Sequence, residues 1–277
     1  MTASRFSRHF LFLAFCLPTT LASGQLVVAH RGASHDAPEN TLAAFRLAWQ
    51  QGADGVEGDY YLTADGRVVC IHDADTERVA GEKLLVAEST FARLRKLDVG
   101  AWKGLRWRGE KIPSMEEVLA TVPAGKKAIL ELKVGPEIVE PMAKIVAASG
   151  LKPEQIVIIS FHPETIAACE RRLPQWRAHW LTSFKKKEDG PWKPTARQVT
   201  ATLQQTRADG LGSMAVPEYF NEAFLQQLRL DGLKEFHVWT VDDPEVAREY
   251  QRLGAWGITT NRPGWLRQQL QLQPQVR

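Results

Sequence analysis

Short runs of apolar and β-branched residues alternate along the chain with longer segments in which apolar residues recur at helical spacing. The runs, which we expect to be strands, lie at 26–30, 55–63, 128–132, 156–161, 177–182, 210–214, 236–241 and 257–260. The clearest helical segments lie at about 40–51, 137–149, 163–173 and from 244 onward. A strand followed by a helix, repeated along a chain, is typical of a parallel sheet in the α/β class. Eight such units predict a single-domain (β/α)8 TIM barrel.

Turn and cap residues support individual elements of this pattern. Asp65-Gly66 is a strong turn signal and predicts a hairpin between the second run and a partner at 67–72. Ser114 and Glu117 have the spacing of a reciprocal capping box at the start of a helix. The rival architecture is an open doubly wound sheet. The first run is not followed by the glycine-rich turn of a dinucleotide-binding unit, which favours the barrel.

Residues 1–24 depart from the pattern and resemble a secretory signal peptide. Arg5 and Arg8 precede the apolar run 10–17, and small residues follow it. We therefore expect an exported protein, periplasmic or secreted, whose barrel domain is 25–277. The alternatives are an uncleaved anchor and a misassigned start. The run is too short to span a bilayer, and we expect no stable membrane insertion of the mature chain.

The composition narrows the class of protein. Of 277 residues, 44% are hydrophobic and 24% charged, which excludes disordered, collagen-like and coiled-coil proteins. The net charge of +3 has no clustered basic excess behind it, so we expect no nucleic-acid partner. Only Cys70 and Cys169 follow residue 24. Both lie in apolar or helical patterns, and we interpret them as buried thiols rather than a disulfide or metal ligands.

Polar residues end the apolar runs, where the active sites of such barrels lie. They are His30, Arg31, Glu57, Asp59, His72, Asp73, Glu131, Lys133, Ser160, His162, Trp239 and Asn261. Two histidines, His30 and His72, suit a general base and a general acid because imidazole titrates near neutral pH. The sequence leaves open which of them has which role.

Three carboxylates among these residues predict a metal site. Glu57 and Asp59 are one residue apart in a strand, so their side chains face the same way, and Glu131 ends a neighbouring run. Buried carboxylates are costly unless compensated, and one hard divalent cation, Ca²⁺ or Mg²⁺, would compensate them. The alternative is an ion-pair network with Arg31 and Lys133. Zinc is disfavoured because no Cys or His group has ligand spacing beside these acids.

The motifs resemble those of glycerophosphodiester phosphodiesterases. They are His30-Arg31-Gly32, Pro38-Glu39-Asn40-Thr41, Glu57-Gly58-Asp59, Thr63-Ala64-Asp65-Gly66, His72-Asp73, Ile112-Pro113-Ser114-Met115-Glu116-Glu117, Glu131-Leu132-Lys133 and Val238-Trp239-Thr240-Val241. Their order covers nearly the whole chain after residue 24. The chain departs from many members of the family at Asn261, where they have an acidic residue.

The resemblance implies a barrel that hydrolyses glycerophosphodiesters to sn-glycerol 3-phosphate and an alcohol, with a divalent cation. The implied site residues are His30 and His72 as the acid–base pair, Glu57, Asp59 and Glu131 as metal ligands, and Arg31, Lys133 and Trp239 at the substrate. The attacking oxygen is either water or the glycerol hydroxyl next to the phosphate. The preferred alcohol and the oligomeric state stay open.

Two other functions compete with this interpretation. One is a phosphodiesterase acting on lysophospholipids or other lipid head groups, which would need an apolar rim. The irregular segment 74–111, with Trp102 and Trp107, is the candidate for such a rim. The other is an exported protein that binds phosphodiesters without hydrolysis. The full set of two histidines and three carboxylates argues against this second alternative.

Overall fold

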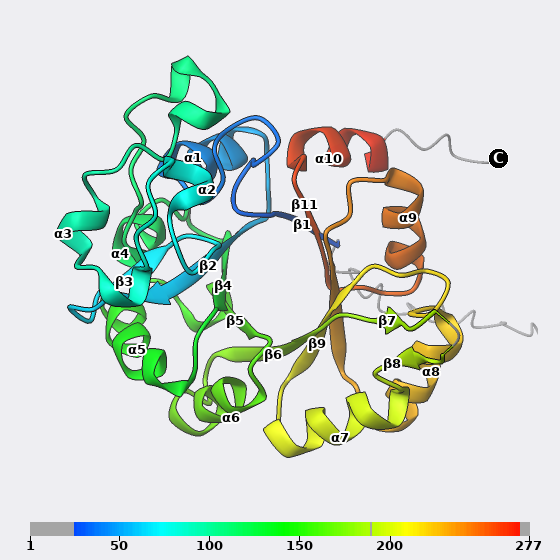
Figure 1. The fold of residues 1–277 in the computed structure, drawn as a ribbon. Coiled ribbons are helices and arrows are strands. Elements are labelled where there is room, and N and C mark those ends of the chain that lie inside the picture. The colour runs from blue at the N-terminus through cyan, green and yellow to red at the C-terminus, as the bar shows by residue number, and fades with distance from the viewer. Residues whose placement is uncertain (1–24, 189, 272–277) are drawn as a thin grey trace, which may run out of the picture.

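Eight parallel strands close into a barrel in the computed structural model, which describes residues 25–188 and 190–271 (Figure 1). The barrel strands are β1 (Leu26–Ala29), β2 (Gly55–Leu62), β4 (Lys127–Leu132), β5 (Ile156–Ser160), β6 (Arg177–Thr182), β9 (Gly210–Met214), β10 (Glu235–Trp239) and β11 (Gly257–Thr260). β1 pairs with both β2 and β11, and this double pairing closes the sheet. The predicted (β/α)8 barrel is confirmed, as is the position of each predicted strand.

An outer ring of helices covers the barrel (Figure 1). Its members are α1 (Leu42–Gln50), α4 (Met115–Leu119), α5 (Val139–Ala148), α6 (Pro163–Arg172), α7 (Ala196–Thr206), α8 (Glu222–Leu230), α9 (Pro244–Arg252) and α10 (Pro263–Gln271). Ser114 and Glu117 form the predicted capping box at α4. Asp243 caps α9, and Pro244 occupies its first turn, where the missing N–H costs no hydrogen bond.

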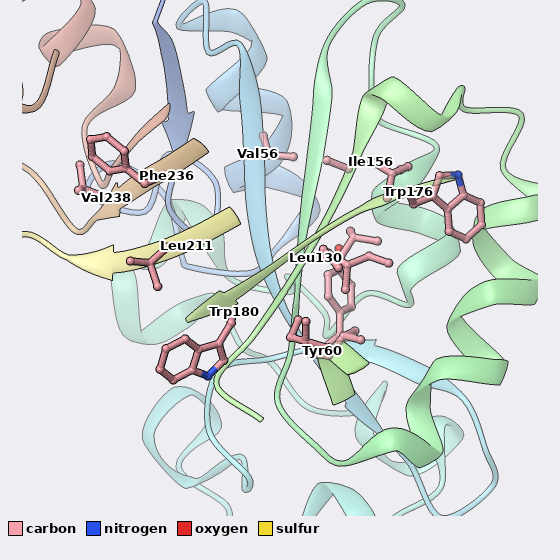
Figure 2. Close-up of a cluster of buried hydrophobic side chains, with 14 of the residues drawn as sticks. Val56, Tyr60, Leu130, Ile156, Trp176, Trp180, Leu211, Phe236 and Val238 are labelled. Carbon is pink, nitrogen blue, oxygen red and sulfur yellow. The ribbon is translucent and has the colours of Figure 1, made fainter. Parts of the chain in front are cut away.

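The main apolar core lies between the strands and the helices. Figure 2 shows part of it, with Tyr60, Leu130 and Phe236 pointing out of the barrel wall among buried neighbours. Because side chains alternate along a strand, the residues between them point into the barrel. On β2 this alternation sends Val56 and Tyr60 to the helix layer and leaves the inward positions to Glu57 and Asp59.

The segment after β2 makes an excursion with a core of its own. β3 (Val68–Cys70) pairs antiparallel with β2, as the Asp65-Gly66 turn predicts. Short helices follow, including α2 (Glu77–Ala80) and α3 (Phe91–Leu94). A second cluster of buried residues, among them Val86, Leu94 and Ile112, fills the inside of this excursion. It projects beside α1 at the upper left of Figure 1.

The two cysteines are in the state that the sequence predicts, whereas one small hairpin was not predicted. Cys70 and Cys169 are buried free thiols, as predicted. Residues 185–187 belong to a small hairpin of β7 (Lys185–Lys186) and β8 (Trp192–Lys193), which the sequence analysis did not predict. The proposed signal peptide, 1–24, lies outside the described residues. In the part of the chain that the structure describes, every helix is too short or too polar to cross a membrane.

Candidate active site

A cavity of about 100 Å³ opens inside the barrel at the ends of the strands. It is lined by His30, Arg31, Glu57, Glu131, Lys133, Ile159, Phe161, His237, Trp239, Thr240 and Thr259. Six of the eight site residues predicted from the sequence are among them. The other two lie close by: Asp59 contacts both Arg31 and Lys133, and His72 lines an adjoining small pocket with Glu39 and Asn40. The structure therefore brings the predicted residues together.

The three carboxylates form one compact group. Asp59 and Glu131 are opposite each other in the register of β2 and β4, and Glu57 lies one inward position earlier on β2. Oxygen atoms of all three lie within 4.8 Å of one another. The spacing of two residues on β2 and the parallel register of β4 thus produce the cluster that the sequence predicts.

Two cations compensate part of this negative charge. Lys133 Nζ lies 2.8 Å from Glu131 Oε1 and 3.2 Å from Asp59 Oδ1. Arg31 Nε lies 3.3 Å from Asp59 Oδ2, and its guanidinium is shared with Glu39 at 2.9 Å. The predicted alternative, an ion-pair network, is therefore present for Asp59 and Glu131.

Glu57 stands outside that network. Its Oε2 accepts a hydrogen bond from the backbone N–H of Arg31 at 2.9 Å, while Oε1 is buried without a partner among the described residues. Burial, and then the charges of Asp59 and Glu131, raise the pKa of Glu57 well above its usual range. Burial alone would also raise the pKa of Asp59, but Lys133 and Arg31 hold that pKa below its usual value. An unpartnered carboxylate oxygen beside two others is the donor set that a hard cation requires.

The loop after β1 carries His30 and Arg31 into the site. Arg31 has a left-handed backbone with φ of 55°, and Gly32 follows with φ of 78°. A Cβ added at Gly32 would lie 2.6 Å from the backbone carbon of Ala44 on α1, so only glycine allows this close approach. Asn40, at the end of the loop, donates from Nδ2 to Asp59 Oδ2 at 2.8 Å. Gly32 and Asn40 therefore help to position His30, Arg31 and Asp59 at the cavity.

The two histidines have different partners. Asp73 Oδ1 lies 2.6 Å from Nδ1 of His72, and Asp73 in turn accepts from Arg78. His30 Nδ1 lies 2.7 Å from Oδ1 of Asn261, which is neutral. Burial, and then the charge of Arg31, lower the pKa of His30. The surroundings of His30 therefore favour its neutral ring, whereas His72 has a carboxylate within hydrogen-bond distance.

Hydrogen bonds fix the orientation of the Asn261 side chain. Its Nδ2 donates to Asp242 Oδ2 at 2.6 Å, so its Oδ1 must face His30. Ser34 donates to the same Oδ1 at 3.0 Å. Because an amide oxygen accepts only, Nδ1 of His30 carries the proton and Nε2 keeps its lone pair. Asn261 therefore sets the tautomer of His30.

Some polar strand ends lie away from the cavity. Ser160 donates to the backbone oxygen of Leu132. His162 precedes α6, is 44% exposed and pairs with Glu164. Conversely, sequence reasoning missed the roles of Asp242 and His237. Strand alternation could have indicated His237, which is two residues before Trp239, but no local signal links Asp242 to Asn261.

Comparison with known proteins now adds to this geometry. A model of the Glycerophosphoryl diester phosphodiesterase family matches residues 30–265. The chain belongs to this family. The predicted enzyme class, hydrolysis of glycerophosphodiesters, is therefore confirmed together with the fold.

Relatives of similar length support the assignment. A glycerophosphodiester phosphodiesterase of Caldanaerobacter subterraneus subsp. tengcongensis is 33% identical over 247 residues, which are 86% of this chain and 94% of the relative. Among solved structures, an Oleispira antarctica phosphodiesterase in complex with the product sn-glycerol-3-phosphate is 25% identical, with a TM-score of 0.79 over 89% of this chain and 96% of that one. A glycerophosphodiester phosphodiesterase of Agrobacterium tumefaciens is 26% identical, with a TM-score of 0.72 over 87% and 98%.

Proposed function

We propose that the chain converts glycerophosphodiesters to sn-glycerol 3-phosphate and an alcohol with one divalent cation, Ca²⁺ or Mg²⁺, held by Glu57, Asp59 and Glu131. The observation that carries the metal is the charge balance of the cavity. Once ionised, as the ligands of a cation must be, the three carboxylates bring three negative charges, while Arg31 and Lys133 supply two positive ones. The phosphodiester adds one more negative charge. A divalent cation would neutralise both charges that remain.

The cation and the basic side chains would share the work of charge stabilisation. When bound, the cation supplies Lewis-acid stabilisation of charge on the phosphate oxygens. Lys133 and Arg31 line the same cavity, where their fixed positive charges favour the anionic substrate and the further charge of the transition state. Phe161 and Trp239, whose rings meet edge to face at 5.4 Å, add an apolar part to the lining of this cavity.

The different partners of the two histidines support different roles for them. His30 is neutral with Nε2 available, so it takes the proton from the attacking hydroxyl as the P–O ester bond forms. His72, whose Nδ1 lies 2.6 Å from Asp73 Oδ1, acts as the acid and gives a proton to the alkoxide that leaves when the other P–O bond breaks. Asn261 supports the first role because its carbonyl oxygen stabilises the Nδ1–H tautomer of His30. The attacking hydroxyl is either water, which gives sn-glycerol 3-phosphate directly, or the glycerol hydroxyl next to the phosphate, which gives a cyclic phosphodiester that water must then open to sn-glycerol 3-phosphate.

Turnover of glycerophosphocholine before and after chelation tests the metal. We expect chelation to abolish release of choline and of sn-glycerol 3-phosphate, and Ca²⁺ or Mg²⁺ to restore both. Full activity of protein shown by elemental analysis to contain less than stoichiometric metal would contradict the proposal. An added control is the melting temperature, since loss of activity through unfolding would appear there.

Lysophospholipids are a second candidate substrate class because two exposed apolar side chains lie in the excursion. Trp102 is 44% exposed and Leu105 77% exposed, and both lie in the excursion. Lys103, between them, donates to the backbone oxygen of Ser34 in the loop that follows His30. This places an apolar rim beside the site, where an acyl chain could pack. Turnover of lysophosphatidylcholine at least equal to that of glycerophosphocholine, and lost in the double variant Trp102→Ser, Leu105→Ser, would favour lipid substrates.

We also propose that the chain is exported and that residues 1–24 are removed. The support is the order of Arg5, Arg8 and the apolar run 10–17. Mass spectrometry of protein from an exporting host should give an N-terminus near Gln25. An intact Met1 on protein recovered from the cytoplasm would contradict export.

A further inference from the structure

Two buried histidines stack inside the barrel, apart from the proposed acid–base pair. His179 on β6 and His237 on β10 are 0% and 3% exposed, and their ring centroids lie 5.3 Å apart. Nδ1 of one ring lies 3.1 Å from Nδ1 of the other. Nε2 of His179 lies 2.9 Å from Oε1 of Glu235. The three side chains form a line that ends at His237.

Glycines on β9 make the space for this pair. A Cβ added at Gly210 would lie 2.9 Å from Nε2 of His179. One added at Gly212 would lie 2.4 Å from Nε2 of His237. Trp256 packs edge-on against both rings, with centroids at 5.8 and 6.2 Å. Glycine at positions 210 and 212 thus leaves two inward-pointing side chains out of the barrel, and the rings of His179 and His237 occupy that space.

This line of side chains ends in the active-site cavity. His237 is among the residues that line the cavity, together with His30 and Lys133. Its Nε2 is buried and has no hydrogen-bond partner within residues 25–188 and 190–271. A buried polar atom without a partner costs free energy, which a bound group can recover. The cavity, at about 100 Å³, has several times the roughly 10–15 Å³ that one water molecule needs.

The hydrogen bonds also determine what Nε2 of His237 can offer. Glu235 accepts only, so Nε2 of His179 carries a proton. If His179 is neutral, its Nδ1 accepts from His237, and Nε2 of His237 is an acceptor. If His179 is charged, its Nδ1 donates to His237, and Nε2 of His237 is a donor. A hydroxyl fits both states because it can donate and accept.

We propose that His237 is a specificity-determining residue that binds the free glycerol hydroxyl furthest from the phosphorus. In either state of His179, Nε2 of His237 suits an uncharged hydroxyl, whereas Arg31 and Lys133 carry the charges that suit the phosphate. The glycerol end is the part common to all glycerophosphodiesters, so a buried contact to it does not restrict the alcohol. His179 and Glu235 act through His237 as positioning residues. The inference rests on the proposed function, and it assigns no role in proton transfer to this pair.

Two substrates separate a glycerol contact from a structural role. The first is glycerophosphocholine, and the second is its analogue with propane-1,2-diol in place of glycerol. The analogue keeps the hydroxyl next to the phosphate and lacks the terminal one. We expect wild-type kcat/KM to be about 10- to 100-fold lower for the analogue, because a buried polar group is then left unpaired. Equal kcat/KM for the two substrates would overturn the inference without any variant.

Two substitutions at His237 provide a matched pair. His237→Asn retains an amide near the position of Nδ1 and loses the group that faces the cavity, whereas His237→Gln places an amide near the position of Nε2. We expect His237→Asn to lower kcat/KM for glycerophosphocholine about 10- to 100-fold and for the analogue less than 3-fold. His237→Gln should retain most of the discrimination. Calorimetry measures the affinities for sn-glycerol 3-phosphate and propane-1,2-diol phosphate without turnover. The two affinities should differ most in the wild type and His237→Gln, and least in His237→Asn.

The outcomes distinguish the inference from the function on which it rests. Equal losses for both substrates in His237→Asn would mean a structural role, and no loss for either would mean that Nε2 binds water only; each overturns the inference. If His237→Asn does not fold, the wild-type comparison and His237→Gln still decide. If wild-type protein with metal does not hydrolyse glycerophosphocholine at all, the proposed function fails first.

Discussion

The barrel interior formed by β1, β2 and β4, here called the charged half, differs from that formed by β6, β9 and β10, the neutral half. In the charged half, nearby cations compensate only part of the negative charge of Glu57, Asp59 and Glu131. In the neutral half, ring nitrogens of His179 and His237 lie within hydrogen-bond distance of each other, and His179 also pairs with Glu235. The charged half thus leaves uncompensated negative charge that attracts a cation. In the neutral half, two side-chain nitrogens are buried without a partner among the described residues, Nε2 of His237 and Nε1 of Trp239, and the first is the proposed contact to a hydroxyl.

The largest expected effect comes from removing the histidines that serve the charged half. His30→Ala and His72→Ala should each lower kcat by about 10²- to 10⁴-fold, since each removes a general acid or base. The double variant should lose far less than the product of both losses, because the two act in one step. Steady-state kinetics at saturating metal test this. Wild-type rates in both single variants would make the non-catalytic binding protein the better interpretation.

The next effect separates metal binding from stability in the charged half. Glu57→Gln removes one anionic ligand, and we expect at least about a 10-fold loss of metal affinity by calorimetry. In the metal-free protein the same change should be stabilising. The raised pKa of Glu57 means that the folded state keeps a proton that the unfolded chain loses above about pH 4.3.

The free energy of unfolding of the metal-free wild type should therefore fall as the pH rises from about 4.3 towards the raised pKa of Glu57. Glu57→Gln should remove this part of the fall, whereas the exposed control Glu116→Gln should retain it. Urea titrations at several pH values measure the difference. Identical pH profiles for Glu57→Gln and the wild type would contradict the burial of an uncompensated charge.

A smaller effect tests the packing of the neutral half. Gly212→Ala forces a methyl group against His237 and should cost about 1–3 kcal/mol of stability, the usual range for overpacking. Gly257→Ala is the matched control, because a Cβ there meets its nearest atom, Val28 Cγ2, at an ordinary 3.6 Å. Denaturant unfolding should separate the two variants. Equal losses of stability in the two variants would show that the space around position 212 is no tighter than that around position 257.

The smallest effect concerns the amide that makes His30 differ from His72. Asn261→Asp places a carboxylate at Nδ1 of His30 and should raise its pKa, which is now lowered. A base must be neutral to act, so the acidic limb of kcat/KM should move to higher pH, with a loss of a few-fold at neutral pH. The basic limb, which does not depend on His30, should stay in place. An unmoved acidic limb would contradict the role of His30 as the base.

Sequence reasoning predicts the charged half better than the neutral half, for a physical reason. Glu57 and Asp59 share a face because of the two-residue strand period, and their place at a strand end follows from the chain around them. His30, Lys133 and Glu131 also end local apolar runs. These features depend on neighbouring residues, which a single sequence displays.

The neutral half depends on register between distant strands. His179 meets His237 only because both β6 and β10 pair with β9, opposite Gly210 and Gly212. Hydrophobic pattern does not specify that register. The contact of Asp242 with Asn261 is similar, since it joins residues 19 positions apart at the ends of β10 and β11. His162 shows the converse error: it ends a strand run, yet the turn into α6 carries it outward.

The excursion between β2 and α4 has a consequence for how such enzymes diversify. Its buried residues, such as Val86 and Leu94, pack against one another and form a cluster separate from the main core of the barrel. Lys103 and Arg106 join it to the backbone of Ser34 and Asp36, beside the entrance. Insertions or replacements there can reshape the approach to the cavity while the chemistry beneath stays intact. Sequence changes in the excursion can therefore alter which molecules reach the cavity, while the residues that carry out the hydrolysis stay the same.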